Sequence, residues 1–321
     1  MNALFSNKPV IFSLVIPAVL LFCFAILMPI IFSVYYGMTD YTGMGEAHFI
    51  GLENFKTILF EDDIFWQSLL HAGLLAVGFV FIQHPICMLF AVLLDKVTGK
   101  WESFFRAAYF IPNVIAVTVI AAMWVFILNP NYGMINTFLH AVGLDSLALQ
   151  WLGDPGIALY SVLVVLIWHG FGWGLLIYYA GIKGIDPQLY EAAAIDGANG
   201  RQAFFKITLP QMKPVIRVNV TLAVISALKQ METVYLMTNG GPGNSTQFLA
   251  NYLYIKAFSS YEYGYGNAIS VLFVLVCLIA TLLLGFVFKD RDGEKRLLRR
   301  LDKNTKRGRF GRSSAVKEAA S

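Results

Sequence analysis

Apolar residues dominate the chain in long runs that hold no charged side chain. Four such runs lie between Lys8 and Asp40, between Asp63 and Asp95, between Arg106 and Asp145, and between Asp154 and Lys183. A bilayer core about 30 Å thick is crossed by about 20 apolar residues in a helix. The pattern therefore predicts six membrane-spanning helices, at residues 10–36, 67–94, 107–128, 157–182, 215–238 and 267–288. Asn129 and Pro130 should end the third of them near Leu128.

The basic residues are distributed unevenly over the connections between these helices. Loops 95–106 and 183–214 are rich in Lys and Arg, whereas loop 129–156 has none and loops 37–66 and 239–266 have one each. Because cytoplasmic loops carry the excess of basic residues, both termini should be cytoplasmic. We divide the chain into an N-terminal helix with an acidic extracellular loop (1–66), a core of five helices (67–288) and a basic cytoplasmic tail (289–321). The tail suits contact with anionic lipid rather than binding of nucleic acid.

Composition supports an all-α polytopic membrane protein. Hydrophobic residues make up 57% of the chain and charged residues 14%, and the mean hydropathy is +0.63. Soluble domains are about 25% charged, so this composition excludes them, along with disordered chains and disulfide scaffolds. Cys23, Cys87 and Cys277 are scattered in apolar runs and predict neither a metal site nor a disulfide. The glycine-rich segment 240–243 lacks the Gly-Lys-Ser/Thr of a phosphate-binding loop, so we expect a tight extracellular turn and no cofactor held by this chain.

Loop 183–214 contains the signals of a short, well-capped helix. Asp186 is a good N-cap and Pro187 suits the first helical position. Three consecutive alanines follow, at residues 192–194, and alanine is the best helix former. Gly197 can adopt the left-handed conformation that ends a helix. This helix, over 187–196, is either a docking element or a simple connection between two spans, and its composition alone leaves both open.

The same loop resembles a known motif. Glu191-Ala-Ala-x-x-Asp196-Gly197-Ala198, followed by Leu209-Pro210, is similar to the EAA loop of the permease subunits of binding-protein-dependent ABC importers. Segments 235–242 and 263–268 resemble the carbohydrate-uptake branch of that family, whose members include maltose-type permeases. The resemblance covers about residues 8–288.

This resemblance implies a cytoplasmic coupling helix between the fourth and fifth spans. In that family the EAA helix sits in a cleft of a separate ATPase dimer, which binds ATP and Mg. The coupling residues implied here are Tyr190, Glu191, Ala192, Ala193, Asp196, Gly197, Leu209 and Pro210. Further implied partners are a second permease subunit, usually a different chain, an extracytoplasmic solute-binding protein and the transported sugar. The expected location is the inner membrane of a bacterial or archaeal cell, crossed several times.

Two charged residues inside the fifth predicted span indicate a path for the transported solute. Lys229 and Glu232 are three residues apart, which would place them on one face of a continuous helix. Ionisable residues within the membrane generally face a cavity or a partner. The alternatives are a mutual ion pair or side chains that extend to the outer interface. The resemblance further implies path residues on the third, fourth and fifth helices, which adds Asn113, Gly170, Trp173 and Gln230.

The sequence thus favours a membrane permease subunit of a sugar importer, with ATP hydrolysis in a partner and no catalytic or metal-binding residue in this chain. Another polar or anionic cargo, such as glycerol phosphate or an acidic oligosaccharide, is an alternative that Lys229 would suit. A membrane-embedded enzyme is a further alternative, but it would need a cluster of catalytic side chains. We expect Trp168 and His169 to serve packing, and Trp173 has the same alternative role.

Overall fold

The computed structural model describes residues 8–288, which form two compact units. The first unit is Met1–Ala280, and the described part of the second, Thr281–Phe288, consists of the end of one helix. Residues 8–288 contain helices and no β-strand; an isolated antiparallel bridge joins Thr39 to Phe49. The predicted domain boundaries stay predictions, and the basic tail 289–321 lies outside the described residues.

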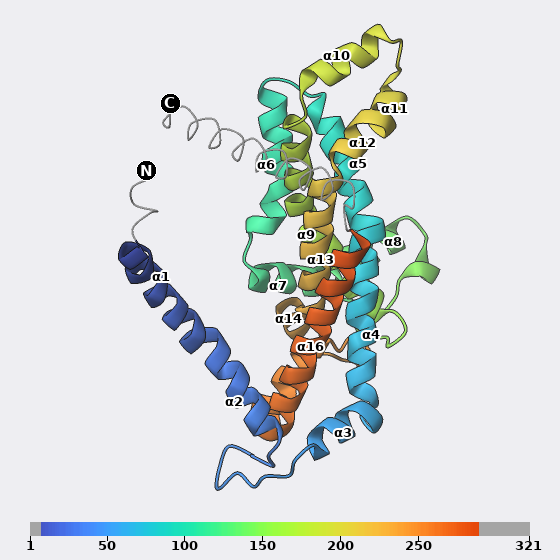
Figure 1. Cartoon of the computed structure of the whole chain (residues 1–321). Helices are drawn as coiled ribbons and strands as arrows, with labels where there is room; N and C mark the ends of the chain where they lie inside the picture. The colour runs from blue at the N-terminus through green and yellow to red at the C-terminus, as the bar shows by residue number, and fades with distance from the viewer. Residues whose placement is uncertain (1–7, 289–321) are drawn as a thin grey trace, which may run out of the picture. The chain divides into compact units, whose positions relative to one another are not determined.

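The helical elements follow one another in a single series (Figure 1). They are α1 (Lys8–Phe22), η1 (Cys23–Leu27), α2 (Met28–Gly37), α3 (Glu53–Phe60), α4 (Asp63–Gly78), η2 (Phe79–Gln83), α5 (His84–Asp95), α6 (Lys100–Val114), α7 (Val117–Ile127), α8 (Met134–Ala141), η3 (Asp145–Leu147), α9 (Ala158–Lys183), α10 (Pro187–Ile195), α11 (Gly200–Ala203), η4 (Phe204–Thr208), α12 (Leu209–Gln211), α13 (Lys213–Leu228), α14 (Glu232–Met237), α15 (Leu249–Tyr254), η5 (Ile255–Ser259) and α16 (Tyr263–Val287). Within the described residues, four stretches are long and apolar enough to cross a membrane: Val15–Gly37, Asp63–Asp95, Ala158–Lys183 and Tyr263–Val287. They match the first, second, fourth and sixth predicted spans.

The third predicted span is not a single helix. α6 and α7 meet at an angle of 92°, because Ile115 and Ala116 between them have extended backbone with ψ of 137° and 136°. Taken together the two helices pass as a broken span or a re-entrant loop. The prediction of one straight helix over 107–128 is therefore wrong, although α7 does end beside Leu128 as expected.

The fifth predicted span is also broken. α13 ends at Leu228 and α14 begins at Glu232, so the prediction of one helix over 215–238 is wrong. Met231, just before α14, has φ of −141° and ψ of −59°, outside the helical region. Lys229 and Glu232 consequently flank a break and do not share the face of a continuous helix. Neither α13 nor α14 is long enough by itself to count as a span, since they have 16 and 6 residues.

Three prolines account for widened turns within helical stretches. Each of the π-helical turns η1, η2 and η4 is followed, two residues after its end, by Pro29, Pro85 or Pro210. A proline has no backbone N–H and crowds the carbonyl four residues earlier. The residue before each proline instead donates to the carbonyl five residues back, as His84 N does to Phe79 O. The helix axis continues, but the side chains near the turn are rotated relative to a regular helix.

The core consists of three clusters of buried side chains. The first lies between α4, α7, α9 and α13 and is centred on Leu75, Ile120 and Val165. The second packs α5 and α9 against Met212, at the end of the first unit that carries α10 (Figure 1). The third joins α3, α4, α15 and α16 around Phe65. By contrast, the described side chains of α1 are exposed and, apart from Ser13, apolar, as expected of a helix that faces lipid.

Asp62 holds three helices together at the end of the unit opposite α10. Its Oδ1 atom accepts hydrogen bonds from the backbone of Ile64 and Phe65 and so caps α4. Its Oδ2 atom accepts the phenolic hydrogens of Tyr252 (2.7 Å) and Tyr265 (2.6 Å). Burial, together with the Asp62 carboxylate, raises the pKa of Tyr252, so this phenol stays protonated as the donor.

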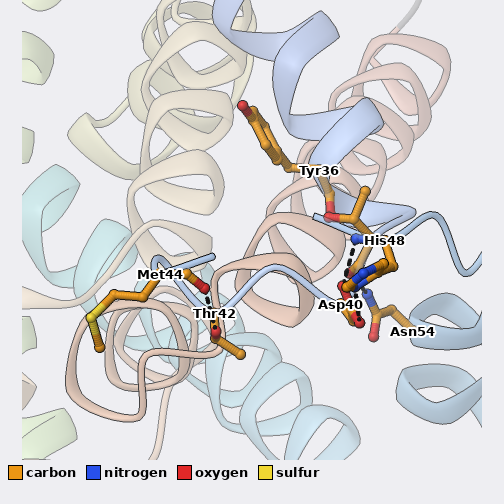
Figure 2. Close-up of polar contacts among 7 residues, drawn as sticks. Tyr36, Asp40, Thr42, Met44, His48 and Asn54 are labelled. Carbon is orange, nitrogen blue, oxygen red and sulfur yellow. Dashed lines mark hydrogen bonds and ion pairs between the residues drawn. The ribbon is translucent and has the colours of Figure 1, made fainter. Parts of the chain in front are cut away.

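The loop after α2 is ordered by local polar contacts (Figure 2). The carboxylate of Asp40 accepts from the backbone N of His48 at 2.8 Å, and its other oxygen lies 3.3 Å from His48 Nδ1. Asn54 in α3 donates to the carbonyls of Gly37 (3.0 Å) and Thr39 (2.9 Å). These bonds attach the end of α2 to α3, so the acidic loop has a defined path over residues 37–54.

Candidate functional site

Two adjoining cavities lie between the helices of the first unit. The smaller, of about 340 Å³, is bordered by η2, α5, α6, α9 and α13. The larger, of about 730 Å³, is bordered by α6, α7, α9, α13, α14 and neighbouring segments. The two share a wall, made of Phe79, Asn113, Gly170, Leu222 and Ser226. Both volumes fall in the range typical of sites for small molecules, about 300–1,000 Å³.

Both broken helices border the larger cavity. Asn113 and Val117 line it from either side of the α6–α7 bend, and residues 229–233 line it along the α13–α14 break. Non-helical backbone at membrane depth is tolerated where it lines a water-filled cavity or is covered by protein. The two departures from the predicted helices therefore meet at one place, and they leave backbone polar groups there without regular helical partners.

Every path residue named from the sequence lines one of these cavities. Asn113 and Gly170 lie in the shared wall, Trp173 lines the smaller cavity, and Lys229, Gln230 and Glu232 line the larger one. Trp173 is 51% exposed. Packing within the described residues therefore does not enclose it.

Lys229 and Glu232 do not pair with one another. No ion pair joins their side chains in the part of the chain that the structure describes, and both are exposed. The alternative of a mutual ion pair is therefore wrong. An ammonium and a carboxylate group that are both open to the same cavity can each meet a polar solute.

Several polar residues of the cavities were not predicted from the sequence. Gln83 and His84 come from the turn before Pro85, and Asn219 comes from α13. A Cβ atom at Gly170 would lie 2.7 Å from Gln83 Nε2, so a larger residue there would displace the end of the Gln83 side chain. The available signal was a pair of adjacent polar residues, Gln83-His84, within a run that is otherwise apolar.

His169 differs in part from its expected packing role. The residue borders the larger cavity, and its Nε2 atom is buried without a hydrogen-bond partner among residues 8–288. Its backbone carbonyl accepts a hydrogen bond of 3.4 Å from Asn113 Nδ2. This bond connects the end of α6, just before the α6–α7 bend, to α9 at the shared wall.

The capping predicted for the helix of loop 183–214 is confirmed. Asp186 accepts from the backbone N of Gln188 at 3.0 Å, and Pro187 opens α10. Gly197 has φ of +77°, and the bonds Gly197 N to Ala194 O (3.1 Å) and Ala198 N to Ala193 O (2.9 Å) form the pattern of a Schellman motif. A Cβ atom at Gly197 would meet nothing within 4 Å, so the backbone conformation itself selects glycine.

A helical stretch follows α10 and returns the chain to α13. Asn199 and Gln202 form a reciprocal capping box with both bonds at 2.9 Å, which the spacing Asn-x-x-Gln could have revealed. Helical structure then continues through α11, η4 and α12, and Pro210 lies within this stretch and does not end it. Tyr190 and Thr208 join α10 to this stretch by a hydrogen bond of 2.8 Å between their hydroxyl oxygens.

The other coupling residues named from the sequence lie on the surface. Glu191, Ala192, Asp196, Gly197 and Pro210 are exposed, and Tyr190, Ala193 and Leu209 are partly buried. α10 contains no buried residue, and Ile195 at its end is 87% exposed. The helix thus projects from the unit (Figure 1), which is the arrangement expected of a docking element.

A polar network lies where α9 enters this loop. Lys183 forms an ion pair of 2.8 Å with Asp95 at the end of α5, and its ammonium lies 5.4 Å from the centre of the Tyr179 ring. Tyr179 donates to Glu102 in α6. These contacts connect the ends of α5, α6 and α9, and each of these helices also contributes residues to the smaller cavity.

Comparison with known proteins decides the family. The family described as "Binding-protein-dependent transport system inner membrane component" matches residues 85–291, which include α10 and all the path residues named from the sequence. The chain belongs to this family. It is thus a membrane permease subunit of an ABC importer, as the EAA loop indicated.

Relatives of this permease match along most of its length. A probable ABC transporter permease of Bacillus subtilis (strain 168) is 37% identical over 290 residues, which are 90% of this chain and 99% of the relative. The diacetylchitobiose uptake system permease of Streptomyces coelicolor is 32% identical over 85% of this chain and 80% of the relative. A chain from the crystal structure of a bacterial ABC transporter that imports the acidic polysaccharide alginate has a TM-score of 0.76 at 23% identity. That match covers 88% of the permease and 96% of the alginate transporter chain, and it shows a shared fold.

Proposed function

We propose that this permease forms the path by which a sugar crosses the cell membrane, through the two cavities that meet at Asn113 and Gly170. The observation that carries the proposal is the meeting of both broken helices at one cavity, whose lining includes polar and charged side chains. Discontinuous helices of this kind form substrate sites in other membrane transporters. The relative named for diacetylchitobiose uptake supports a sugar as the cargo.

We further propose a topology of six spans with both termini in the cytoplasm. α6–α7 and α13–α14 would each complete a span as a broken one, in addition to the four long stretches. The basic residues of loops 95–106 and 183–214 support a cytoplasmic position for α10. The inner membrane of a bacterial or archaeal cell is the location that this topology and the family suggest.

The proposed role of α10 is to transmit force from a separate ATPase. That ATPase dimer would bind ATP and Mg, and this chain would contribute no hydrolytic step. The capped helix, with Glu191 and Ala192 exposed on it, supports a close contact in a single cleft. Two further partners would complete the importer. One is a second permease subunit with a different sequence, and the other is an extracytoplasmic solute-binding protein.

A second candidate cargo is an acidic oligosaccharide or another anionic solute. The observation that favours it is the ammonium group of Lys229, which lines the larger cavity and forms no ion pair within residues 8–288. Glu232 lines the same cavity, and its carboxylate suits the hydroxyl groups of a neutral sugar equally well. Neutral and acidic sugars should therefore be compared in the same transport assay.

Uptake by cells that carry the complete importer tests the proposal. Radiolabelled neutral and acidic sugars are supplied to wild-type cells and to cells that lack only this permease. The proposal predicts ATP-dependent accumulation of at least one sugar that is lost with the permease. Accumulation of none of the sugars, together with uptake of an amino acid or a peptide by the same importer, would contradict it.

A further inference from the structure

Four side chains form a polar network at the end of α9 that leads into α10. The ammonium group of Lys183 lies 2.8 Å from a carboxylate oxygen of Asp95, the last residue of α5. One turn earlier on α9, the hydroxyl group of Tyr179 donates to Glu102 in α6 at 2.5 Å, a length typical of hydrogen bonds from a hydroxyl group to a carboxylate. The network thus joins α5 and α6 to α9 only three residues before Asp186, the N-cap of α10.

α6 is joined to its neighbours at two further levels. In its middle, the ring of Tyr109 contacts those of Phe90 in α5 and Phe171 in α9, with ring centres 5.5 and 5.9 Å apart. A Cβ atom at Gly172 would lie 2.3 Å from the carbonyl oxygen of Tyr109, so the backbones of α6 and α9 are in direct contact there. At the far end is the hydrogen bond from Asn113 to α9. Because α6 has no buried residue of its own, these contacts set its position.

The polar network and the cavity wall lie at opposite ends of α6. Glu102 and Asn113 are 11 residues apart in the sequence, which is about 16 Å along a helix. Asn113 lines both cavities and lies just before the α6–α7 bend. Packed side chains and rigid helices of this kind can carry energetic coupling between distant sites. A displacement of the α10 end of α9 can therefore reach the bend through α6, provided that α6 stays attached at Glu102.

The network determines geometry more than stability. The side chains of Lys183 and Asp95 are 49% and 36% exposed, and ion pairs that are open to water contribute little to folding. The ammonium group also lies 5.4 Å from the centre of the ring of Tyr179, a residue that is 6% exposed. Loss of one of these polar contacts should therefore leave the buried cluster intact and change only how the ends of α5 and α6 are held against α9.

We propose that Lys183 and Tyr179 are positioning residues for the coupling of ATP hydrolysis to transport. They hold Asp95 and Glu102 against the end of α9, so that a displacement of α10 reaches the α6–α7 bend at the larger cavity. Without these contacts the ATPase still docks on α10, but α9 moves without α6. This inference rests on the proposed role of α10, and it specifies which contacts carry the displacement to the cavities.

Val117 can report on the bend, because it opens α7 and lines the larger cavity. It is replaced by cysteine after Cys23, Cys87 and Cys277 are changed to serine, and the complete importer is purified. The rate of its reaction with a methanethiosulfonate reagent is measured without nucleotide and after trapping with ATP and vanadate. With the network intact, the two rates should differ about fivefold or more, as expected for two coupled sites.

Two substitutions each remove one contact of the network. Lys183→Met removes the charge and keeps the length of the side chain, and Tyr179→Phe removes the hydroxyl group and keeps the ring. Each should reduce the difference between the two rates to about twofold or less, while the ATPase subunit is retained and ATP is still hydrolysed. Lys96→Met is the matched control, because Lys96 follows Asp95, is exposed and forms no ion pair within residues 8–288. It should leave the difference unchanged.

An exchange of charges tests the ion pair itself. Lys183→Glu should reduce the difference between the two rates as Lys183→Met does, and the addition of Asp95→Lys should restore it, since the pair then forms with the opposite polarity. A wild-type difference in both Lys183→Met and Tyr179→Phe, or no restoration by the exchange, would overturn the positioning role alone. Equal rates in the two states with the network intact would also contradict the proposed coupling through α10.

Discussion

The hydroxyl oxygens of Tyr190 and Thr208 lie 2.8 Å apart and join α10 to η4 across 18 residues of sequence. Thr208 is 5% exposed, whereas α10 has no buried residue of its own. The orientation of α10 therefore depends on this bond and on the caps at its two ends. A helix that transmits force from a partner has to be held in this way, since a freely hinged helix would move without moving the spans.

Loss of this bond should uncouple ATP hydrolysis from transport. We expect Tyr190→Phe and Thr208→Val each to lower the amount of sugar imported per ATP hydrolysed, while the permease still inserts and assembles. Because the two hydroxyl groups share one bond, the double variant should be little worse than either single one. Reconstituted importer with simultaneous uptake and ATPase assays measures the ratio, and fully additive losses would contradict the shared bond.

Gly197 offers a test of the geometry at the end of α10. Its φ of +77° costs residues other than glycine about 1–2 kcal/mol, so Gly197→Val should fray the helix and reduce uptake. Asparagine tolerates this conformation better than most residues, so Gly197→Asn should retain more activity. The measurement is retained ATPase subunit and sugar uptake in the purified complex.

Gly200 is the matched control for that test. It lies three residues further on, and a Cβ atom there also meets nothing within 4 Å, but its φ is not in the left-handed range. Gly200→Ala should leave uptake within about twofold of wild type. Equal uptake by Gly197→Val and wild type would indicate that the loop only connects two spans.

Substitution of Lys229 should distinguish a neutral cargo from an acidic one. If its ammonium group binds a negative charge in the larger cavity, Lys229→Gln should reduce uptake of an acidic sugar by about tenfold or more, since hydrogen bonds to charged groups are worth about 1.5–3 kcal/mol. Uptake of a neutral sugar should change much less, and Lys229→Arg should keep the preference. An equal loss of uptake for both sugars would mean that Lys229 stabilises the α13–α14 break and does not select the cargo by charge.

The proposed topology can be tested with single cysteines. Asp145 and Arg201 are both exposed and lie in connections that we place on opposite sides of the membrane. In intact cells an impermeant thiol reagent should label Asp145→Cys but not Arg201→Cys. Arg201→Cys should be labelled only after the cells are opened. Labelling of Arg201→Cys alone in intact cells would contradict the six-span arrangement.

The sequence predicted those parts of the fold that depend on local chemistry. The length of charge-free runs located four spans, because a membrane helix must bury its backbone polar groups over a fixed thickness. The caps of α10 were predictable from Asp186, Pro187 and Gly197, since each residue type meets one backbone requirement.

The two helix breaks could not be predicted in the same way. The α6–α7 bend lies at Ile115 and Ala116, which are apolar and look like the middle of a span. The α13–α14 break lies at residues 229–231, where the charge of Lys229 indicated a cavity but not a turn. Gln83 and His84 were missed because their orientation depends on two features that the sequence does not show. One is the widened turn before Pro85, and the other is the packing of this turn against α9.

Protection of one cavity position by the cargo tests the central claim most directly. Ser226 in α13 lines both cavities, and Val218 in the same helix is 55% exposed and lines neither. Each is replaced by cysteine after Cys23, Cys87 and Cys277 are changed to serine, and the rate of reaction with a methanethiosulfonate reagent is measured in the complete importer. At a sugar concentration ten times its Kd, labelling of Ser226→Cys should slow about tenfold, in proportion to occupancy, and labelling of Val218→Cys should not change. Unchanged labelling at both positions, in an importer that still accumulates the sugar, would contradict a transport path through these cavities.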